Sequence, residues 1–210
     1  MENQGIIQPS SSPWASPVSI VTKPDPRFCI LLLFRLSLNK NLVGNPWPLS
    51  SMEDCLGTLG GEKYLSCLDV QSAYWQQPIT DASERPETAF VTPDGKCEFK
   101  RLPFGVANTL WIYQRFMLEN VSALGPSMDL LIYLDDIVLA SPTWNHRIQL
   151  FGSVLSLLQQ VGITLKPSKV QFGSKSIYCL GHEVSPSGIA VSPDRTQAIT
   201  TLKAPKSVKE

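Results

Sequence analysis

The chain has 210 residues, 43% of them hydrophobic, which is enough for one sizeable domain or two small lobes around a core. Eighteen basic and eighteen acidic side chains cancel, so the global positive field of a dedicated nucleic-acid-binding protein is excluded and any such binding must be local. The apolar runs are too short to cross a membrane, and the five cysteines have no C-x-x-C spacing, which argues against a zinc site or a disulfide framework and predicts an intracellular protein with reduced thiols.

In chain order, residues 1–15 are rich in Ser, Pro and Gln and lack periodicity, which predicts a flexible lead-in. Short apolar runs between turn residues predict strands at residues 18–21, 27–34, 64–69, 88–91, 97–100, 130–132, 137–140, 176–180, 182–184 and 189–191. Apolar residues at helical spacing, with Ser50, Asn108 and Gly162 as terminal residues, predict helices at residues 51–59, 109–121 and 145–161. Hairpins within this mixture favour an antiparallel α+β fold over a doubly wound parallel sheet.

Two adjacent carboxylates stand between apolar strands in the sequence Tyr133-Leu134-Asp135-Asp136. The short link predicts the tip of a β-hairpin. Asp favours turns on its own, so a plain turn is one explanation of the pair and a metal site is the other.

A third carboxylate, Asp69, closes the predicted strand at residues 64–69, where a turn former or a helix cap is the simpler interpretation. If the strands are neighbours in one sheet, Asp69 lies beside Asp135 and Asp136. Unit charges about 4 Å apart repel by about 4 kcal/mol per pair at an effective dielectric near 20. A divalent cation would remove this penalty, and oxygen ligands without His or Cys select Mg²⁺ or Mn²⁺ over zinc.

Five motifs follow one another along the chain: Leu68-Asp69-Val70-Gln71-Ser72-Ala73-Tyr74-Trp75-Gln76; Leu102-Pro103-Phe104-Gly105 with Asn108 and Gln114; Tyr133-Leu134-Asp135-Asp136; Gly162-Ile163-Thr164-Leu165-Lys166-Pro167-Ser168-Lys169; and Tyr178-Cys179-Leu180-Gly181-His182. Their order and spacing resemble the reverse transcriptase of gypsy-type LTR retrotransposons, over the fingers and palm at residues 16–191. The resemblance implies a right-hand polymerase of α+β class, with an antiparallel palm sheet backed by helices. It also implies a mostly absent thumb, with residues 192–210 as its start or a linker.

The resemblance implies an RNA-directed DNA polymerase, which transfers nucleotides from deoxynucleoside triphosphates to a primer on an RNA or DNA template. Asp69, Asp135 and Asp136 would hold Mg²⁺, with Mn²⁺ as the alternative ion, and the Val70 backbone carbonyl would be a further ligand. One ion would lower the pKa of the primer hydroxyl and the other would stabilise the leaving oxygen. Lys169 matches a candidate proton donor to pyrophosphate, and a solvated loop lysine is its alternative interpretation.

Further residues match family positions that contact nucleotide or nucleic acid. Tyr74 matches an aromatic gate that excludes a 2′-hydroxyl, and its alternative interpretation is a core aromatic. Lys23 and Arg27 match positions that hold the triphosphate, and without the resemblance both would be surface charges. The remaining matches are Phe104 and Gly105 at the nucleotide, and Tyr133, Leu180 and Gly181 at primer and template.

Departures from the family pattern leave other interpretations open. Leu33-Phe34-Arg35-Leu36-Ser37-Leu38-Asn39 stands where relatives carry Asp-Tyr-Arg-x-Leu-Asn, and Trp111 replaces a small residue, adding volume that close packing tolerates poorly. The alternative function is a catalytically decayed retroelement relic with at most weak nucleic-acid binding. An unrelated α+β interaction module would require all the motifs to be coincidental. For the polymerase we expect a cytoplasmic location, no membrane partner and association with the rest of a Pol polyprotein.

Overall fold

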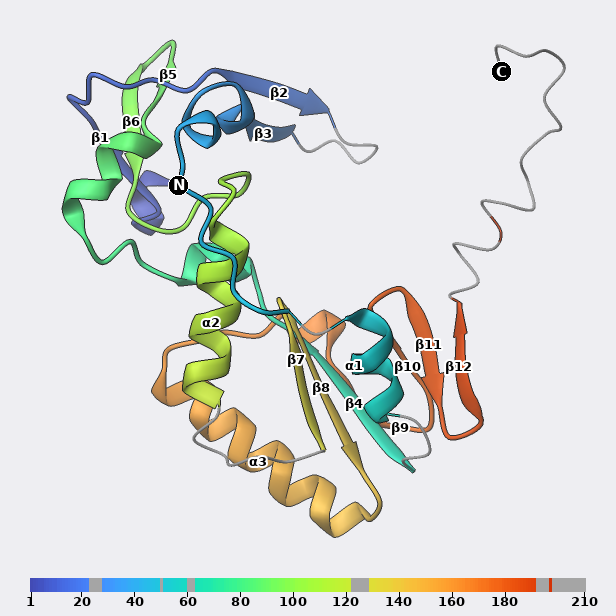
Figure 1. Ribbon diagram of the computed structural model, residues 1–210. Coiled ribbons are helices and arrows are strands. Elements are labelled where there is room, and N and C mark those ends of the chain that lie inside the picture. Colours follow the sequence, from blue (N-terminus) through green and yellow to red (C-terminus); the bar gives the residue numbers. More distant parts are fainter. Residues whose placement is uncertain (23–27, 50, 60–62, 122–128, 192–196, 198–210) are drawn as a thin grey trace, which may run out of the picture. The chain divides into compact units, whose positions relative to one another are not determined.

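The computed structural model describes residues 1–22, 28–49, 51–59, 63–121, 129–191 and 197 (Figure 1). They form two compact units, each assembled from separate stretches of the chain. The first unit comprises Met1–Pro48, Gln71–Asn120 and Val161–Thr164, and the second comprises the described parts of Leu49–Val70, Val121–Gln160 and Leu165–Glu210. Within the described ranges, no helix has both the length and the apolar character needed to cross a bilayer.

The first unit contains two small antiparallel sheets, in the strand orders β1-β6-β5 and β2-β3. Its strands are β1 (Ile7–Pro9), β2 (Val18–Thr22), β3 (Phe28–Leu32), β5 (Phe90–Thr92) and β6 (Gly95–Phe99). Its helices are the 3-10 turns η1 (Glu2–Gln4), η2 (Phe34–Leu36), η3 (Leu38–Lys40), η4 (Ala73–Gln76) and η5 (Ala82–Thr88), and nearly all of α2 (Thr109–Val121).

The predicted lead-in at residues 1–15 contains regular structure that the sequence pattern does not reveal. Strand β1 pairs with β6, and Glu98 of β6 accepts hydrogen bonds from Gln8 Nε2 at 2.7 Å and from Ser10 Oγ at 2.5 Å. Such a short strand has no measurable periodicity, and its partner lies far along the chain. The pairing is therefore a tertiary effect that a local pattern cannot predict.

Two other details of the first unit differ from expectation. The strand predicted at residues 27–34 ends at Leu32, because Phe34 turns inward into η2, is fully buried and packs edge-on against Phe99 with ring centroids 6.5 Å apart. Asn108 precedes α2 as predicted, and its carbonyl accepts a hydrogen bond from Ile112 N at 3.0 Å. Its side chain makes contacts that the sequence did not predict, because it donates to Val43 O at 3.0 Å and accepts from Asn45 N at 3.4 Å. Trp111 is half-buried on α2.

The second unit contains a four-stranded antiparallel sheet, in the order β7-β8-β4-β9, and a three-stranded sheet, in the order β10-β11-β12. The strands are β4 (Tyr64–Asp69), β7 (Leu130–Tyr133), β8 (Asp136–Ser141), β9 (Gln171–Ser174), β10 (Ile177–Cys179), β11 (His182–Ser185) and β12 (Gly188–Val191). The helices are α1 (Met52–Leu59), α3 (Trp144–Gln160) and the 3-10 turn η7 (Pro167–Lys169).

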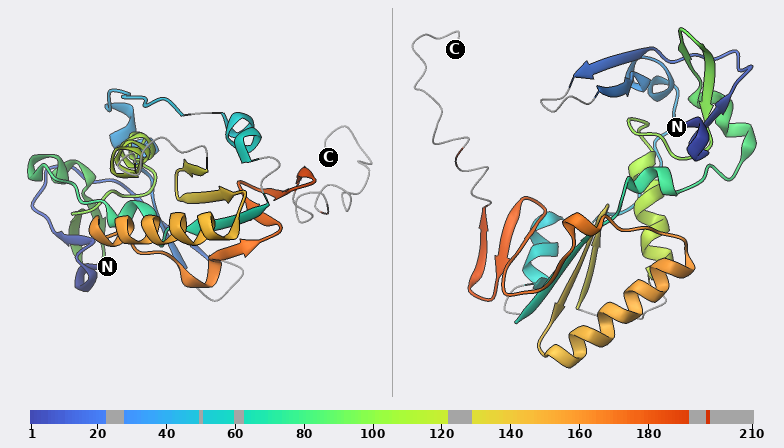
Figure 2. Two further views of the ribbon diagram at one scale, coloured as in Figure 1. Left: turned by 90° about the horizontal axis from the view of Figure 1, so that it is seen from below. Right: turned by 180° about the vertical axis from the view of Figure 1, so that it is seen from behind.

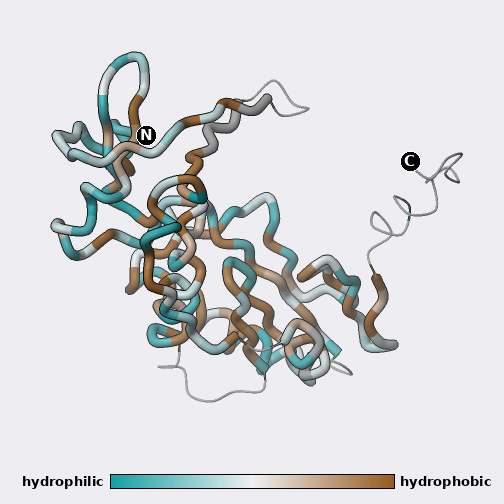
Figure 3. Tube along the Cα trace, turned by 45° about the horizontal axis from the view of Figure 1, so that its top comes forward, coloured by the Kyte–Doolittle hydropathy of each residue, from teal (hydrophilic) through white to brown (hydrophobic). Residues whose placement is uncertain are grey.

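The four-stranded sheet is buried on both faces, because α1 and α3 lie on opposite sides of it (Figure 2). Leu65 and Cys67 of β4 point to the side of α1, where they join a core with Leu56 and Ile177. Hydrophobic segments run through these strands in Figure 3. The long apolar runs of β4 and β8 in the sequence therefore reflect burial on two faces.

The two helices of this unit begin and pack slightly differently from the predictions. Ser51 Oγ accepts from Asp54 N at 3.0 Å, so the N-cap of α1 is Ser51, while the predicted cap Ser50 and the predicted stop Gly60-Gly61 lie outside the described residues. Helix α3 confirms the helix predicted at residues 145–161. Two of the apolar residues at helical spacing that predicted it, Ile148 and Leu155, are nevertheless exposed.

The buried residues of α3 are Arg147 and, as the helical spacing predicted, Val154 and Leu158. Arg147 is fully buried, and its Nη2 donates to Leu139 O at 2.9 Å and to Tyr64 O. Burial lowers the pKa of Arg147 to about 10, which still leaves it charged at neutral pH. The buried face of α3 therefore includes a charged residue, which the apolar spacing could not predict, together with Val154 and Leu158 of the apolar stripe.

Candidate active site

Three carboxylates meet at one end of the four-stranded sheet. Asp69 is the last residue of β4 and Asp136 is the first residue of β8, and the two are direct partners across the β4–β8 ladder. Asp135 lies beside them in the β7–β8 turn, and its carbonyl accepts a hydrogen bond from Val70 N at 3.0 Å. The prediction that these strands are neighbours and bring the carboxylates together is confirmed.

The hairpin tip itself is shifted by one residue from the predicted Asp135-Asp136 link. Tyr133 pairs with Asp136, which leaves Leu134 and Asp135 as the two turn residues. Leu134 has φ 56°, a left-handed conformation that costs a branched side chain roughly 1 kcal/mol or more. The tight turn fixes Asp135 at the open end of the sheet, where it is exposed, while Asp136 is half-buried inside the strand.

An open cavity of about 570 Å³ lies over the carboxylates. Its wall is built from the strand ends, the η7 segment and the turn between β10 and β11. The lining residues are Cys67, Asp69, Asp135, Asp136, Ser168, Lys169, Val170, Gln171, Tyr178, Cys179, Leu180 and Gly181. The predicted primer residues Leu180 and Gly181 therefore share a cavity with the three acids.

Burial, together with the neighbouring Asp135 and Asp69 carboxylates, raises the pKa of Asp136 to about 6. A hydrogen bond from the Leu180 N–H opposes this rise. Leu180 and Gly181 both have positive φ, 51° and 76°, which turns the hairpin sharply at this point. The sequence predicted that Leu180 and Gly181 lie near the primer, but it did not predict the hydrogen bond from Leu180 to Asp136.

Lys169 forms an ion pair with Asp69, with Nζ 2.6 Å from Oδ2. The Asp69 side chain is 17% exposed and the Lys169 side chain 55% exposed. The hydrogen bond to Asp69 raises the pKa of Lys169, so the ammonium group holds its proton more strongly than a free lysine does. Lys169 is therefore engaged with the acid cluster and is not a solitary loop lysine.

The chemistry of this donor set suits a hard divalent cation, since it offers carboxylate oxygens whose mutual repulsion already perturbs Asp136. No backbone hydrogen bond among the described residues ends on the Val70 carbonyl, the further ligand suggested by the sequence. In the described part of the chain, no three His, Cys, Asp or Glu residues are already arranged to hold a metal ion. The Lys169 ammonium instead lies against the Asp69 carboxylate.

Two cysteines in the cavity wall were not predicted from the sequence to be part of the site. Cys67 precedes Asp69 by two residues on β4, and Cys179 lies on β10. Burial raises the pKa of both thiols, that of Cys179 to about 11 and that of Cys67 further. Both thiols therefore stay neutral at physiological pH.

The predicted nucleotide residues Tyr74, Phe104 and Gly105 lie together in the first unit. The Tyr74 ring is 5.0 Å from the Phe104 ring and 5.3 Å from the Tyr113 ring, measured between centroids. Phe104 is 49% exposed, and Gly105 has φ 89°, a conformation that glycine adopts without strain. Lys23 and Arg27, predicted at the triphosphate, lie outside the described residues.

The side chain of Asn39 holds the loop after Phe104 in place. Its Nδ2 donates to Gly105 O at 2.8 Å, and its Oδ1 accepts from Ala107 N at 3.0 Å. In the sequence, Asn39 is only the last residue of the segment Leu33–Asn39, which diverges from the family pattern. Its position at the end of that segment gave no local signal of a contact with this loop.

Gln76 makes a similar contact beneath Tyr74. Its Oε1 accepts from Thr164 N at 2.7 Å, and its Nε2 donates to Thr164 O at 2.9 Å and to Gln71 O. These bonds enclose Ser72, which has φ 52° and is therefore in a strained left-handed conformation. The side chain of Gln76 thus fixes η4, the turn that carries Tyr74.

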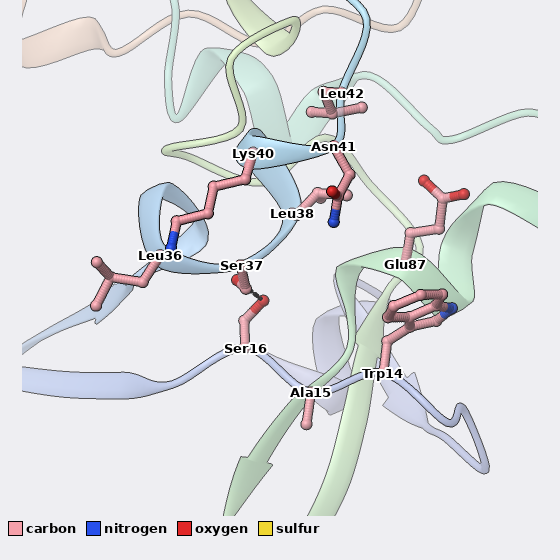
Figure 4. A pocket seen from close by; sticks show the side chains of 10 residues that line it. All are labelled: Trp14, Ala15, Ser16, Leu36, Ser37, Leu38, Lys40, Asn41, Leu42 and Glu87. Carbon is pink, nitrogen blue, oxygen red and sulfur yellow. Dashed lines mark hydrogen bonds between the residues drawn. The ribbon is translucent and has the colours of Figure 1, made fainter.

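A second cavity, of about 340 Å³, lies in the first unit (Figure 4). Trp14 and Leu36 line it together with Lys40 and Glu87, and a hydrogen bond of 2.7 Å joins the hydroxyls of Ser16 and Ser37 at its wall. It contains a single carboxylate. The convergence of acids distinguishes the cavity in the second unit as the candidate active site.

Residues 29–184 match the family model described as reverse transcriptase (RNA-dependent DNA polymerase). The chain belongs to the reverse transcriptase family. Two relatives from Drosophila melanogaster are the retrovirus-related Pol polyproteins from transposons opus and gypsy. The opus protein is 33% identical over 98% of this chain and 21% of its own length, and the gypsy protein is 31% identical over 97% of this chain and 20% of its own length. The gypsy-type resemblance is thereby confirmed, and this reverse transcriptase chain spans about a fifth of these relatives.

The fold comparison gives the same family architecture. A foamy viral protease-reverse transcriptase, whose structure was solved in complex with double-stranded DNA, matches with a TM-score of 0.89 at 22% identity. The match covers 99% of this chain and 36% of the viral chain. The predicted α+β class with antiparallel sheets backed by helices is therefore confirmed for this reverse transcriptase.

Proposed function

We propose that the chain is the nucleotidyl-transfer centre of an RNA-directed DNA polymerase, which joins deoxynucleotides to a primer 3′-hydroxyl on an RNA or DNA template. One observation carries the proposal: Asp69 and Asp136 are direct partners at the end of the β4–β8 ladder, with Asp135 in the adjoining turn. A sheet that gathers negative charge at an open cavity of about 570 Å³ is suited to cations and phosphates, and not to apolar ligands.

Asp69 and Asp135, supported by Asp136 and the Val70 carbonyl, would hold Mg²⁺, or Mn²⁺ in its place. Such an ion, when bound, neutralises the carboxylates, binds substrate phosphates and increases the acidity of the attacking hydroxyl. The chain's own contribution is the placement of these oxygens on strand ends and in a two-residue turn, where the backbone leaves them little freedom.

Lys169 would exchange its contact with Asp69 for the negatively charged phosphates of the substrate. Its raised pKa keeps it protonated at neutral pH, so it can bind pyrophosphate as a cation. Once phosphates replace Asp69 as its partner, the ammonium group would be the proton donor to the leaving group. The ion pair with Asp69 holds the ammonium group at the cavity before the substrate arrives.

Further residues would contact the nucleotide and the primer. Tyr74 would lie under the sugar, where its ring leaves no room for a 2′-hydroxyl, with Phe104 and Gly105 beside it. Lys23 and Arg27 would hold the triphosphate. The turn at Leu180 and Gly181, with Tyr133, would hold the primer end near the acids. A solved relative of the same fold, a foamy viral enzyme, is described in complex with double-stranded DNA, which supports a primer–template duplex as the partner.

The test is primer extension by the purified chain, with a DNA primer on an RNA template, across a Mg²⁺ titration and with Asp135→Asn as the matched variant. We expect extension by the wild-type chain that depends on Mg²⁺ and falls by at least about 100-fold in Asp135→Asn. Folded wild-type protein that extends no primer with either Mg²⁺ or Mn²⁺ would contradict the proposal. Salt-sensitive duplex binding without extension would then identify the decayed relic.

The relatives of this chain are Pol polyproteins of which it spans about a fifth. We therefore propose that the centre works together with other parts of such a polyprotein. Co-expression with the neighbouring coding sequence, followed by the same extension assay, would show whether those parts increase primer use.

A further inference from the structure

Gln171 links the two sheets of the second unit through its side chain. It is the first residue of β9, and its backbone pairs with Cys67 of β4, two residues from Asp69. Its Nε2 donates to Tyr178 O at 3.0 Å, and its Oε1 accepts from Tyr178 N at 3.0 Å. A single carboxamide therefore satisfies both backbone groups of one residue on β10.

This contact takes the place of a strand pairing. Strands β9 and β10 belong to different sheets, and the ladder of β10 runs only to β11. Without Gln171, the backbone groups of Tyr178 that face β9 would bond to water, and water would not hold β10 to β9. Rotating the carboxamide by 180° would oppose two oxygens and two N–H groups, so the network permits only one orientation.

The apolar contacts of β10 do not replace these bonds. Ile177 and Cys179 are buried in the core shared with α1 and β4, which holds the hairpin against the sheet. Burial of Ile177 and Cys179 on one face opposes a one-residue slip, which would turn Tyr178 inward. Apolar contacts are not directional, however, so they tolerate smaller shifts that paired hydrogen bonds resist. The Tyr178 side chain is 52% exposed and adds no anchor of its own.

The register of β10 sets the position of the turn that follows it. Leu180 and Gly181 come directly after β10 and line the cavity that contains Asp69, Asp135 and Asp136. A slip of β10 would carry this turn along the cavity wall and move the Leu180 N–H relative to Asp136. The distance in sequence from Tyr178 to the turn is too short to absorb such a slip.

We propose that Gln171 is a positioning residue of the polymerase, whose carboxamide fixes the register of β10 and so holds the Leu180–Gly181 turn at the acid cavity. The inference rests on the proposed function, because that function assigns the turn to the primer. Gln171 itself lines the acid cavity, but both polar atoms of its side chain are bonded to Tyr178, so we infer that it acts on the primer through the hairpin.

The test compares Gln171→Met with the wild-type chain, because methionine keeps the length and volume of glutamine and removes the hydrogen bonds. Gln149→Met is the matched control, since Gln149 lies exposed on α3 of the same unit. Two readouts are needed: amide hydrogen exchange at Tyr178 and Leu180, and steady-state kinetics with primer–template and deoxynucleotide varied separately.

We expect faster exchange at both amides in Gln171→Met and a rise in KM for primer–template of about 5- to 30-fold, the range that two lost hydrogen bonds imply. The KM for deoxynucleotide and the kcat at saturating duplex should stay within about threefold of wild type.

Two results would overturn the inference. Unchanged exchange at Tyr178 in Gln171→Met would show that the carboxamide does not hold β10. Equal losses in the duplex KM, the nucleotide KM and kcat, with a lower melting temperature, would show a merely structural role. Failure of the proposed function can be distinguished from failure of this inference. If the wild-type chain extends no primer, amide exchange still measures how firmly β10 is held, and fluorescence anisotropy still measures the affinity for duplex.

Discussion

Asp69 and Asp136 face each other across the last rung of the β4–β8 ladder. Directly opposed like charges destabilise a sheet, and here a third carboxylate, Asp135, adds to the repulsion. The fold therefore accepts an electrostatic cost at one end of its most buried strands. A bound cation would relieve that cost, and the predictions below follow from this proposal.

The first prediction concerns the pH dependence of stability in the absence of divalent ions. Folding raises the pKa of Asp136 from 3.8 to about 6, so its contribution to stability is fully present below pH 3.8 and is lost as the pH rises through about 6. Asp136→Asn removes this loss, and at pH 7.5 we expect it to be more stable than wild type by about 1–2 kcal/mol after solvent screening is allowed for.

Urea denaturation at pH 4.5, 6 and 7.5 in chelating buffer would measure the effect. Asp94→Asn, in the exposed turn between β5 and β6, serves as the control for an unspecific change of net charge. The prediction fails if wild type and Asp136→Asn lose stability in parallel as the pH rises.

The second prediction concerns the ion pair of Lys169 with Asp69. Replacing Lys169 with Met removes a positive charge 2.6 Å from Asp69 Oδ2, so the affinity for Mn²⁺ should increase by about three- to tenfold. The rate of nucleotide incorporation should nevertheless fall by about 10- to 100-fold, because the variant lacks the cation and proton donor for pyrophosphate.

Calorimetric Mn²⁺ titration and rapid-quench incorporation would give the two quantities separately. Lys175→Met is the matched control, because Lys175 is an exposed lysine of the same unit in the β9–β10 connection. A decrease of both metal affinity and rate in Lys169→Met would show that the ion pair supports the metal site instead of competing with it.

The third prediction concerns sugar selection by Tyr74. Gln76 binds both backbone groups of Thr164 and thereby holds the turn that carries Tyr74. In Gln76→Met the ring should lose its fixed position, and the preference for deoxynucleotides over ribonucleotides, measured as the ratio of kcat/KM values, should fall by about tenfold.

Gln71→Met is the control for this experiment, because Gln71 is exposed and contributes only backbone atoms to the same network. An equal loss of kcat/KM for both sugars in Gln76→Met would assign Gln76 to stability and not to selection.

The fourth prediction compares two glycines of the second unit. Gly173 has φ 60°, and a Cβ at this position would lie 2.8 Å from Trp144 Cζ3, so Gly173→Ala should destabilise the fold by about 1–3 kcal/mol. Gly152 lies on α3 with open space around its Cα, so Gly152→Ala should stabilise by about 0.5–1 kcal/mol. Opposite shifts of the thermal midpoint would confirm the pair of effects, and shifts of the same sign would contradict it.

Much of the second unit could be predicted from the sequence, because its strands and long helix carry strong local patterns. The apolar runs of β7, β8 and β4 and the carboxylates at their ends led directly to the convergence of Asp69 with Asp136. The predicted hairpin tip was wrong by one residue. Nothing in the sequence indicates that Leu134 has a positive φ, and the adjacent aspartates Asp135 and Asp136 are residues that favour turns.

The contacts that position the site could not be predicted in the same way. Gln76, Gln171 and Asn39 each use a side-chain amide to bind the backbone of a segment far along the chain or in another sheet. Such bonds depend on the assembled fold and leave no periodicity. The burial of Arg147 in place of Ile148 could not be predicted either. The long aliphatic part of Arg147 packs as an apolar residue does, but a charged residue at this position predicts an exposed side chain.

The central claim is that Asp69, Asp135 and Asp136 capture a divalent cation in one cavity. Titration of Mn²⁺ into the purified chain at pH 7.5, followed by calorimetry, tests it most directly, with the double variant Asp69→Asn/Asp135→Asn checked for folding by circular dichroism. We predict saturable uptake by the wild-type chain and at least about tenfold weaker uptake by the folded double variant. Equal uptake by both proteins, or none by the wild-type chain, would contradict the claim.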